Sequence, residues 1–181
     1  FQCMGLPNRG FGPTQPGGWI YNILPFLEEN SLHELGAPSP TAAQLKQVAM
    51  TPFSVMNCPT RRPAEPFRAG PVQWQPYWTE KLDVVARNDY AANAGDLQID
   101  HPGSSNKNGP PPPAAKTNGM VGRAWVVNLK QVNDGVSKTI FAAEKYVNPD
   151  NYLNGLDLGD NENMYIGSDR DVFRHDFQPC L

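Results

Sequence analysis

The densest group of side chains capable of chemistry lies in the segment 148–176, which holds seven acidic residues against two basic ones. Calcium prefers six to eight oxygen ligands from carboxylates, amides and backbone carbonyls, and Asn, Asp and Glu supply such groups here. Gly155, Gly159 and Gly167 allow the backbone to turn its carbonyls inward. The spacing does not match an EF-hand. The composition predicts a Ca²⁺ site in the 148–171 loop, with the candidate ligands Asp157, Asp160, Glu162, Asp169 and Asp171.

The same loop has an alternative explanation, in which its Asp and Asn side chains cap turns by accepting nearby backbone amides. The sequence leaves both explanations open. Asp89 and Asp134, in the stretches NDYAANAGD and NDG, are expected to fix turns in the same way. Lys145 and the pair Arg61-Arg62 are expected to pair with acids of the 150–171 loops at the surface, where such ion pairs add little stability.

A second candidate site is aromatic. Trp74, Tyr77 and Trp78 lie within five residues of one another in a proline-rich loop. Exposed rings of this kind stack on sugar faces or on side chains of a partner. The alternative is that these rings cover the core beneath a long loop. Trp19 and Trp125 lie in periodic apolar segments and are assigned to the core.

The residues capable of catalysis form no known motif. A nucleophile elbow, a zinc-protease motif and a phosphate-binding glycine loop are all missing from the sequence around His33, His101 and His175. Glu144 and an acid of the 148–171 loop could act as the two carboxylates of a glycoside hydrolase. The alternative is that Glu144 forms an ion pair or caps a neighbouring turn. The sequence therefore predicts a protein without enzymatic activity, in which the expected partners of Glu144 are Arg87, Arg123 or Lys145.

The whole chain has the composition of one loop-rich domain. Its 181 residues include 19 prolines and 16 glycines, and its formal charge is −3. Without a basic cluster it has no electrostatic basis for binding nucleic acid, and no stretch is long and apolar enough to predict membrane contact. We treat 1–181 as a single domain. Cys3, Cys58 and Cys180 allow one disulfide, and their spacing does not decide whether or where it forms.

The elements expected to position these residues are short. Apolar spacing predicts helix between 19 and 35, interrupted or restarted at Pro25, and Thr41 to Gln44 has the form of a capping box that begins a helix ending near Met50. Strands are expected at 53–57 and 122–129, extended structure at 82–92, and a buried strand at 139–143 that ends at Glu144. These elements indicate an α+β fold, with a helix packed on a small antiparallel sheet and long ordered loops.

Five separated stretches together resemble one family. They are NRGFGPTQPGGWIYNILPFLEE (8–29), FSVMNCPTRRPA (53–64), NDYAANAGD (88–96), VNDGVSKTIFAAEKYVNPDNY (132–152) and GDNENMYIGSDRDVFR (159–174). In this order they are similar to the pilin-like exported proteins abundant in planctomycetes, a domain of unknown function sometimes labelled solute-binding.

The resemblance implies a prepilin signal and a long hydrophobic helix before Phe1, and an H-x9-DG motif after Leu181. It also implies export to the periplasm, cell envelope or extracellular space, and assembly with other protein subunits through the N-terminal helix. The expected function is that of a noncatalytic structural or adhesive head domain, pilin-like or pseudopilin-like. The alternatives are a module that binds glycans or small solutes through the 74–78 loop, and a glycoside hydrolase.

Overall fold

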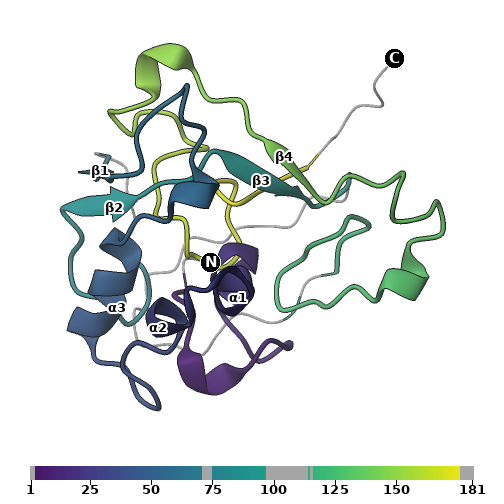
Figure 1. Ribbon diagram of the computed structural model, residues 1–181, viewed down its shortest axis with the longest axis horizontal. Coiled ribbons are helices and arrows are strands. Elements are labelled where there is room, and N and C mark those ends of the chain that lie inside the picture. Colours follow the sequence, from purple (N-terminus) through teal and green to yellow (C-terminus); the bar gives the residue numbers. More distant parts are fainter. Residues whose placement is uncertain (1–2, 71–74, 97–113, 115, 176–181) are drawn as a thin grey trace.

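The computed structural model describes residues 3–70, 75–96, 114 and 116–175 (Figure 1). Short helices and two small sheets are joined by long irregular segments, so the expected α+β class is confirmed. In the described part of the chain, every helix is too short or too polar to cross a membrane.

Proline ends helix α1, and a capping box begins helix α3. Helix α1 (Trp19–Ile23) gives way to a 3-10 turn at Leu24–Leu27, because Pro25 lacks the amide that an α-helix would use there. Helix α2 (Asn30–His33) follows. Helix α3 (Ala42–Met50) starts with the expected capping box, in which the amide of Gln44 donates to Thr41 Oγ1 at 3.3 Å and the Thr41 amide to Gln44 Oε1 at 2.9 Å.

Two sheets form the β part of the domain. Strands β1 (Pro66–Arg68) and β2 (Val84–Ala86) pair antiparallel, and α3 packs against β2. In the second sheet, β3 (Tyr90–Asn93) lies between β4 (Ala142–Glu144) and β5 (Phe173–Arg174). β4 is antiparallel to β3, but β5 is parallel to it, so this sheet is mixed and not purely antiparallel. The extended structure expected at 82–92 is confirmed by β2 and β3.

Three expectations about strands were wrong. The segment expected as a strand at 53–57 contains a 3-10 turn, Ser54–Met56. The segment 122–129 has isolated bridge residues, among them the pair Gly122 and Trp125, before a 3-10 turn at Leu129–Gln131, and it forms no named strand. The strand that delivers Glu144 is present but not buried, since Ile140 is 65% exposed and the strand begins only at Ala142. Apolar runs in a loop-rich chain therefore do not imply burial.

The core lies between α1, α3, the two sheets and the segment 164–173. The N-terminal segment is tied to this core because Met4 forms a bridge with Ile166, and the amide of Gly167 donates to the carbonyl of Cys3 at 2.9 Å. A Cβ atom on Gly18 would lie 2.2 Å from the carbonyl oxygen of Ile166, so only glycine permits the start of α1 to approach this segment.

Candidate functional site

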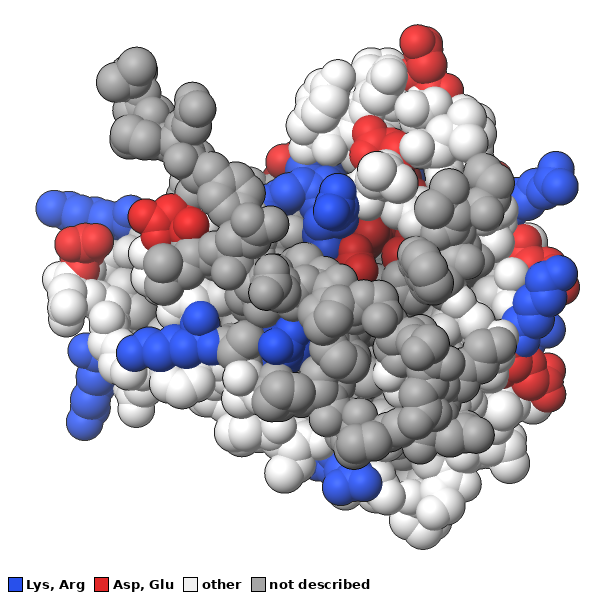
Figure 2. Space-filling view, turned by 180° about the vertical axis from the view of Figure 1, so that it is seen from behind, with Lys and Arg blue, Asp and Glu red and all other residues white. Residues whose placement is uncertain are grey.

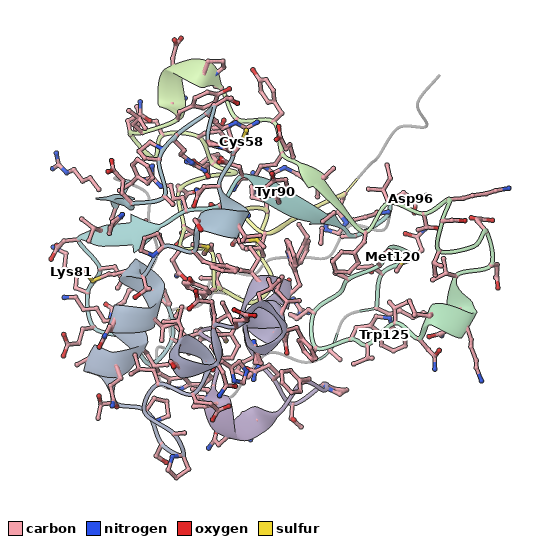
Figure 3. All side chains as sticks on the ribbon, viewed as in Figure 1. Cys58, Lys81, Tyr90, Asp96, Met120 and Trp125 are labelled. Carbon is pink, nitrogen blue, oxygen red and sulfur yellow. The ribbon has the colours of Figure 1, made fainter. Side chains whose placement is uncertain are left out.

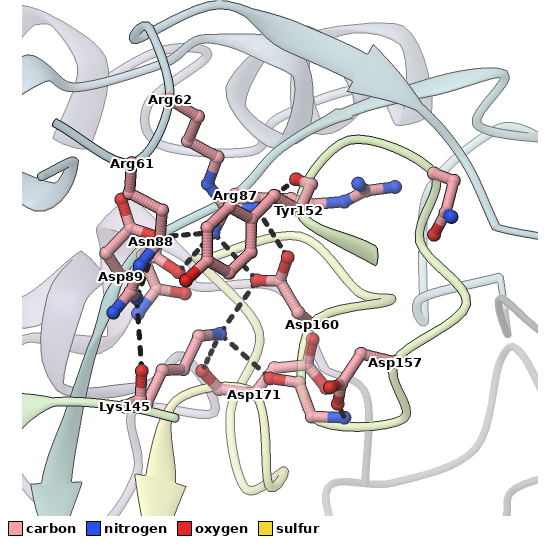
Figure 4. A network of polar contacts seen from close by, with 12 residues as sticks. Arg61, Arg62, Arg87, Asn88, Asp89, Lys145, Tyr152, Asp157, Asp160 and Asp171 are labelled. Carbon is pink, nitrogen blue, oxygen red and sulfur yellow. Dashed lines mark hydrogen bonds and ion pairs between the residues drawn. The ribbon is translucent and has the colours of Figure 1, made fainter. Parts of the chain in front are cut away.

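Asp160 lies at the centre of a buried network of charged side chains (Figure 4). Its carboxylate accepts hydrogen bonds from both terminal nitrogens of Arg62, with 2.8 Å between Oδ1 and Nη2, and Lys145 Nζ lies 3.0 Å from the same Oδ1. All three side chains are almost fully buried. Burying an unpaired charge is costly, so their mutual pairing is what permits them to lie inside the protein.

Arg62 joins Asp160 to a second buried carboxylate. Its Nη2 lies 2.7 Å from Asp89 Oδ1 and donates to the carbonyl of Asn88 at 2.8 Å. Asp89 Oδ2 accepts the amide of Cys58 at 2.8 Å, so this carboxylate holds a turn 31 positions away in the chain instead of capping a turn in its own stretch. The Arg62 guanidinium thus holds together the turn that follows Cys58, the turn between β2 and β3, and the 148–171 loop.

The second sheet sets the positions of Asp89 and Lys145. Tyr90, the first residue of β3, pairs with Glu144, the last residue of β4. Just beyond this pair, the amide of Lys145 donates to the carbonyl of Asp89 at 2.8 Å. Because the antiparallel register is fixed by these pairs, Asp89 and Lys145 are brought to the same end of the sheet.

Lys145 has acceptors for all three of its ammonium protons. Besides Asp160, its Nζ donates to the carbonyls of Gly159 and Asp171, each at 2.9 Å. Burial lowers the pKa of Lys145, and attraction to Asp160 opposes this change. Burial would also raise the pKa of Asp160, but Lys145 and Arg62 outweigh burial and hold that pKa below its ordinary value. The Asp160 carboxylate is therefore ionised at neutral pH.

Asp171 is the carboxyl group in this region whose charged form is least favoured. It is buried, its Oδ1 accepts the amide of Glu162 at 2.9 Å, and its Oδ2 has no hydrogen-bond partner among the described residues. Burial raises the pKa of Asp171 well above its ordinary value, although attraction to Lys145 opposes the rise. Its protonation is thus coupled to the charge of Lys145.

The predicted metal ligands make contacts of a different kind from those of a calcium site. Asp157 accepts the amides of Asn148 and Gly159, each at 2.9 Å, and Asp169 accepts that of Asp171 at 3.4 Å. Glu162 Oε1 accepts the side-chain amide of Asn161 at 3.2 Å. Within the described residues, no group of three or more His, Cys, Asp and Glu side chains could share a metal ion. Calcium binding stays an untested prediction, while the turn-capping alternative has specific hydrogen bonds.

The sequence-based interpretation placed the basic residues of this region at the surface, and this was wrong for Arg62 and Lys145. Lys145 and Arg62 do pair with an acid of the 150–171 loop, as expected, but both side chains are buried instead of lying at the surface. Arg61 is the partially exposed member of the pair, and its Nη1 donates to the carbonyl of Lys145 at 3.0 Å. The sequence could not show which of two neighbouring arginines points inward.

The aromatic loop contributes to packing. Tyr77 is buried, and Trp78 is half-buried and packs against the core, with 5.8 Å between the two ring centroids. Trp74 lies outside the described residues. The contacts of Tyr77 and Trp78 are those of rings that cover a core. Cys3 and Cys58 are free thiols, burial raises the pKa of Cys3 to about 11, and Cys180 also lies outside the described residues.

The candidate catalytic groups are placed at different parts of the domain. Glu144 is half-exposed, and its Oε2 lies 3.7 Å from Nη2 of Arg61, which was not among its three expected partners. His33 is buried beside α1, with its Nδ1 2.8 Å from Glu34 Oε1. His175 follows β5, and its ring meets that of Phe173 edge-to-face. His101 lies outside the described residues.

A cavity of about 270 Å³ is lined by residues other than the charged residues of this network. It is formed by three segments, 11–23, 120–127 and 167–173, together with Phe141. Trp19 and Trp125, which the sequence assigned to the core, are both half-buried and line this cavity. The signal that could have found it is the combination of glycines with aromatic residues in GFGPTQPGGW, because bare backbone beside rings favours a concave surface.

Four of the five stretches that resemble the exported family meet in the charge network. Arg62 comes from the second, Asp89 from the third, Lys145 from the fourth, and Asp160 and Asp171 from the fifth, while Trp19 of the first lines the cavity. The chain is therefore an α+β domain in which four of the five family-like stretches contribute to one set of buried ion pairs.

A family of proteins of unknown function (DUF1559) matches residues 3–168, which is most of the chain, and the protein belongs to this family. No curated protein and no solved structure gives a significant match. The resemblance drawn from the five stretches is thus confirmed at the level of the family.

Proposed function

We propose that this protein is a noncatalytic head domain of an exported envelope subunit, with a structural role in an assembly of like subunits. The observation that carries the proposal is the use of the charged residues in the family-like stretches. Asp160, Arg62 and Lys145 bind one another inside the fold, where they join separate loops and are not open to a substrate. Buried ion pairs that fix irregular loops in place are consistent with a structural role for the domain.

The surface offers a place for contact between subunits. The loop after β4 carries an exposed tyrosine and three leucines, each more than half-exposed: Tyr146, Leu153, Leu156 and Leu158. Exposed apolar side chains close together favour protein contact. On the face in Figure 2, the visible Lys and Arg side chains are spread among acidic and uncharged ones, an arrangement that gives little support to nucleic acid as the partner. Attachment through a helix preceding Phe1 is the part of the proposal that rests on the family resemblance.

The proposal is tested by site-specific cross-linking of the full-length protein in the cells that make it. In a Cys58→Ser background, Leu156→Cys places a thiol on the loop that carries Leu153, Leu156 and Leu158, here called the leucine loop. The control, Ser39→Cys, places a thiol on an exposed polar turn. With a membrane-impermeant bis-maleimide added to intact cells, we expect oligomers from the Leu156→Cys protein and far fewer from the control. Protection of both thiols from the reagent, or equal yields of monomer, would contradict the proposal.

A further inference from the structure

The cavity beside α1 has walls of two chemical kinds. One kind is aromatic: the Trp19 ring is fixed by a hydrogen bond from its Nε1 to the carbonyl of Val172 at 2.6 Å, and it meets the Phe141 ring edge-to-face with 5.7 Å between centroids. Trp125 lies on the segment beside α1 (Figure 3). These rings offer flat apolar faces to whatever enters.

The second kind of wall is bare backbone. Five glycines contribute to the lining, so peptide groups face the cavity without side chains over them: Gly12, Gly17, Gly18, Gly122 and Gly167. Asn22, at the end of α1, also lines the cavity. Its Nδ2 donates to the carbonyls of Gly17 and Gly18, and its Oδ1 has no hydrogen-bond partner in the described part of the chain. A ligand that carries hydroxyl groups suits such a wall better than a hydrocarbon chain does.

Among the described residues that line the cavity, the charged one is Arg123, and none is Asp or Glu. Lys116 Nζ lies 5.3 Å from the centre of the Trp125 ring. A guanidinium binds carboxylates in a fixed planar geometry, and removal from bulk water strengthens the attraction. A cationic ligand would be repelled here, while an anionic one would be attracted.

Size selects among anionic ligands. A cavity of about 270 Å³ is at the small end of ligand sites, close to the volume needed for one ring-shaped group with its substituents. A pyranose ring has apolar C–H faces that stack on indoles, and hydroxyls at its edge that need hydrogen-bond partners. We propose that this cavity binds one pyranose ring of an acidic glycan, with the ring against Trp125 and Trp19 and its carboxylate near Arg123.

This binding site is distinct from the leucine loop, so the proposal does not depend on the assembly of subunits. The test uses the purified chain and isothermal titration calorimetry. A galacturonate hexasaccharide is the acidic probe, and maltohexaose is a neutral probe of the same length. We expect saturable binding of the acidic probe, at least tenfold tighter than binding of the neutral one, and weaker binding as salt is raised because the attraction is screened.

Two variants locate the binding. Arg123→Gln should weaken binding of the acidic probe at least fivefold, whereas Lys81→Gln, at an exposed lysine on another part of the domain, should leave it unchanged. Trp125→Ala should weaken binding at least tenfold, and Trp125→Phe should restore part of it because the flat ring is kept. Urea midpoints of all variants establish that they are folded.

Three results would overturn the proposal. The first is no saturable binding of the acidic probe by the folded wild-type chain. The second is equal affinity for both probes, which would exclude recognition of the carboxylate. The third is binding that survives Trp125→Ala and Arg123→Gln, which would place the site elsewhere. None of these results bears on the cross-linking experiment, so a failure here is distinguishable from a failure of the envelope-subunit proposal.

Discussion

At the scale of single residues, buried charged side chains hold separate loops together. Asp160 pairs with Arg62 and Lys145, and Lys145 also donates to the carbonyls of Gly159 and Asp171. Replacing a whole buried ion network by apolar groups is often neutral, but removing one partner is not, because the remaining charges stay buried. The energetic role of this network is therefore best measured by removing its shared member.

Asp160→Asn should destabilise the fold by about 3 kcal/mol, at the lower end of the range for broken buried pairs. The loss is limited because Arg62 keeps Asp89, and Lys145 keeps two backbone carbonyls. The measurement is urea unfolding at pH 7. Asp150→Asn makes the same change of charge at an exposed position in the same loop, and it should change the free energy of unfolding by less than about 0.5 kcal/mol. Equal effects of the two substitutions would show that Asp160 adds no more than overall charge.

The raised pKa of Asp171 predicts a pH dependence of stability opposite in sign to that expected from Asp160. The pKa of Asp171 is raised in the folded protein, so the unfolded chain loses this proton first as the pH rises. The contribution of Asp171 to stability is present below the ordinary carboxyl pKa of about 3.9 and is lost as the pH rises through the folded pKa. The contribution of Asp160, whose pKa is lowered, is present above about pH 4 and is lost on acidification.

The variant Asp171→Asn isolates this effect, because the amide oxygen can still accept the amide proton of Glu162. Relative to the wild type, we expect the variant to become more stable as the pH is raised from about 4 to 7. Urea midpoints at four pH values in this range provide the comparison. A constant difference in stability between the two proteins across the range would mean that Asp171 has an ordinary pKa in the fold.

At the scale of elements, the sequence predicted best where the signal is local. The capping box at Thr41 needs only neighbouring residues, and it begins α3 as expected. The proline at position 25 ends α1 for an equally local reason. The prediction of a strand at 122–129 was wrong because residues 122–127 line a cavity, while Val126 and Leu129 are exposed. The sequence pattern of such a segment is similar to that of a half-buried strand. Pairing of β5 with β3 joins residues far apart in the chain, which no local pattern specifies.

Gly155 lies where the 148–171 loop meets Arg87, which connects this loop to the first sheet. It has a positive φ of 69°, and a Cβ atom there would lie 2.3 Å from Nη2 of Arg87. That guanidinium donates to the carbonyl of Arg68, the last residue of β1, at 2.6 Å. Gly135 also has a positive φ, 85°, but nothing lies within 4 Å of its Cβ position.

Substitution by alanine should therefore cost different amounts at the two glycines. Gly135→Ala carries only the conformational penalty of about 1 kcal/mol. Gly155→Ala carries the same penalty and must also displace Arg87, so we expect about 2 kcal/mol more. Chemical denaturation of both variants gives the difference directly. Equal losses would show that the loop moves away from Arg87 without cost.

At the scale of the whole molecule, the family resemblance and the α+β class were within reach of the sequence, while the sites were not. The acidic loop was identified, but the charge of Asp160 is compensated inside the fold by Arg62 and Lys145, which lie 98 and 15 positions before it in the chain. Such partners become visible only when the sheet brings Asp89 and Lys145 together. The cavity is assembled from three separated segments, and for the same reason its two tryptophans were assigned to the core.

The calcium hypothesis is tested by the stability of the whole domain, because an ion that binds only the folded state would stabilise it. A site at a calcium concentration 100 times its Kd adds about 2.7 kcal/mol, which raises the midpoint of a domain of this size by roughly 5–10 °C. The contacts in the described residues argue for a smaller effect. Asp160 is engaged by two cations, and Asp157 by two backbone amides, so calcium would have to displace these partners.

We therefore expect the same thermal midpoint in calcium and in EGTA, with magnesium as the control cation. If calcium alone raised the midpoint, the loop would be a metal site after all, and Asp160→Asn would identify its ligands. Loss of the rise in that variant would mean that calcium replaces Lys145 or Arg62 at the Asp160 carboxylate. Persistence of the rise would instead assign the ion to the more exposed Asp157 and Asp169, whose hydrogen bonds to backbone amides leave lone pairs available.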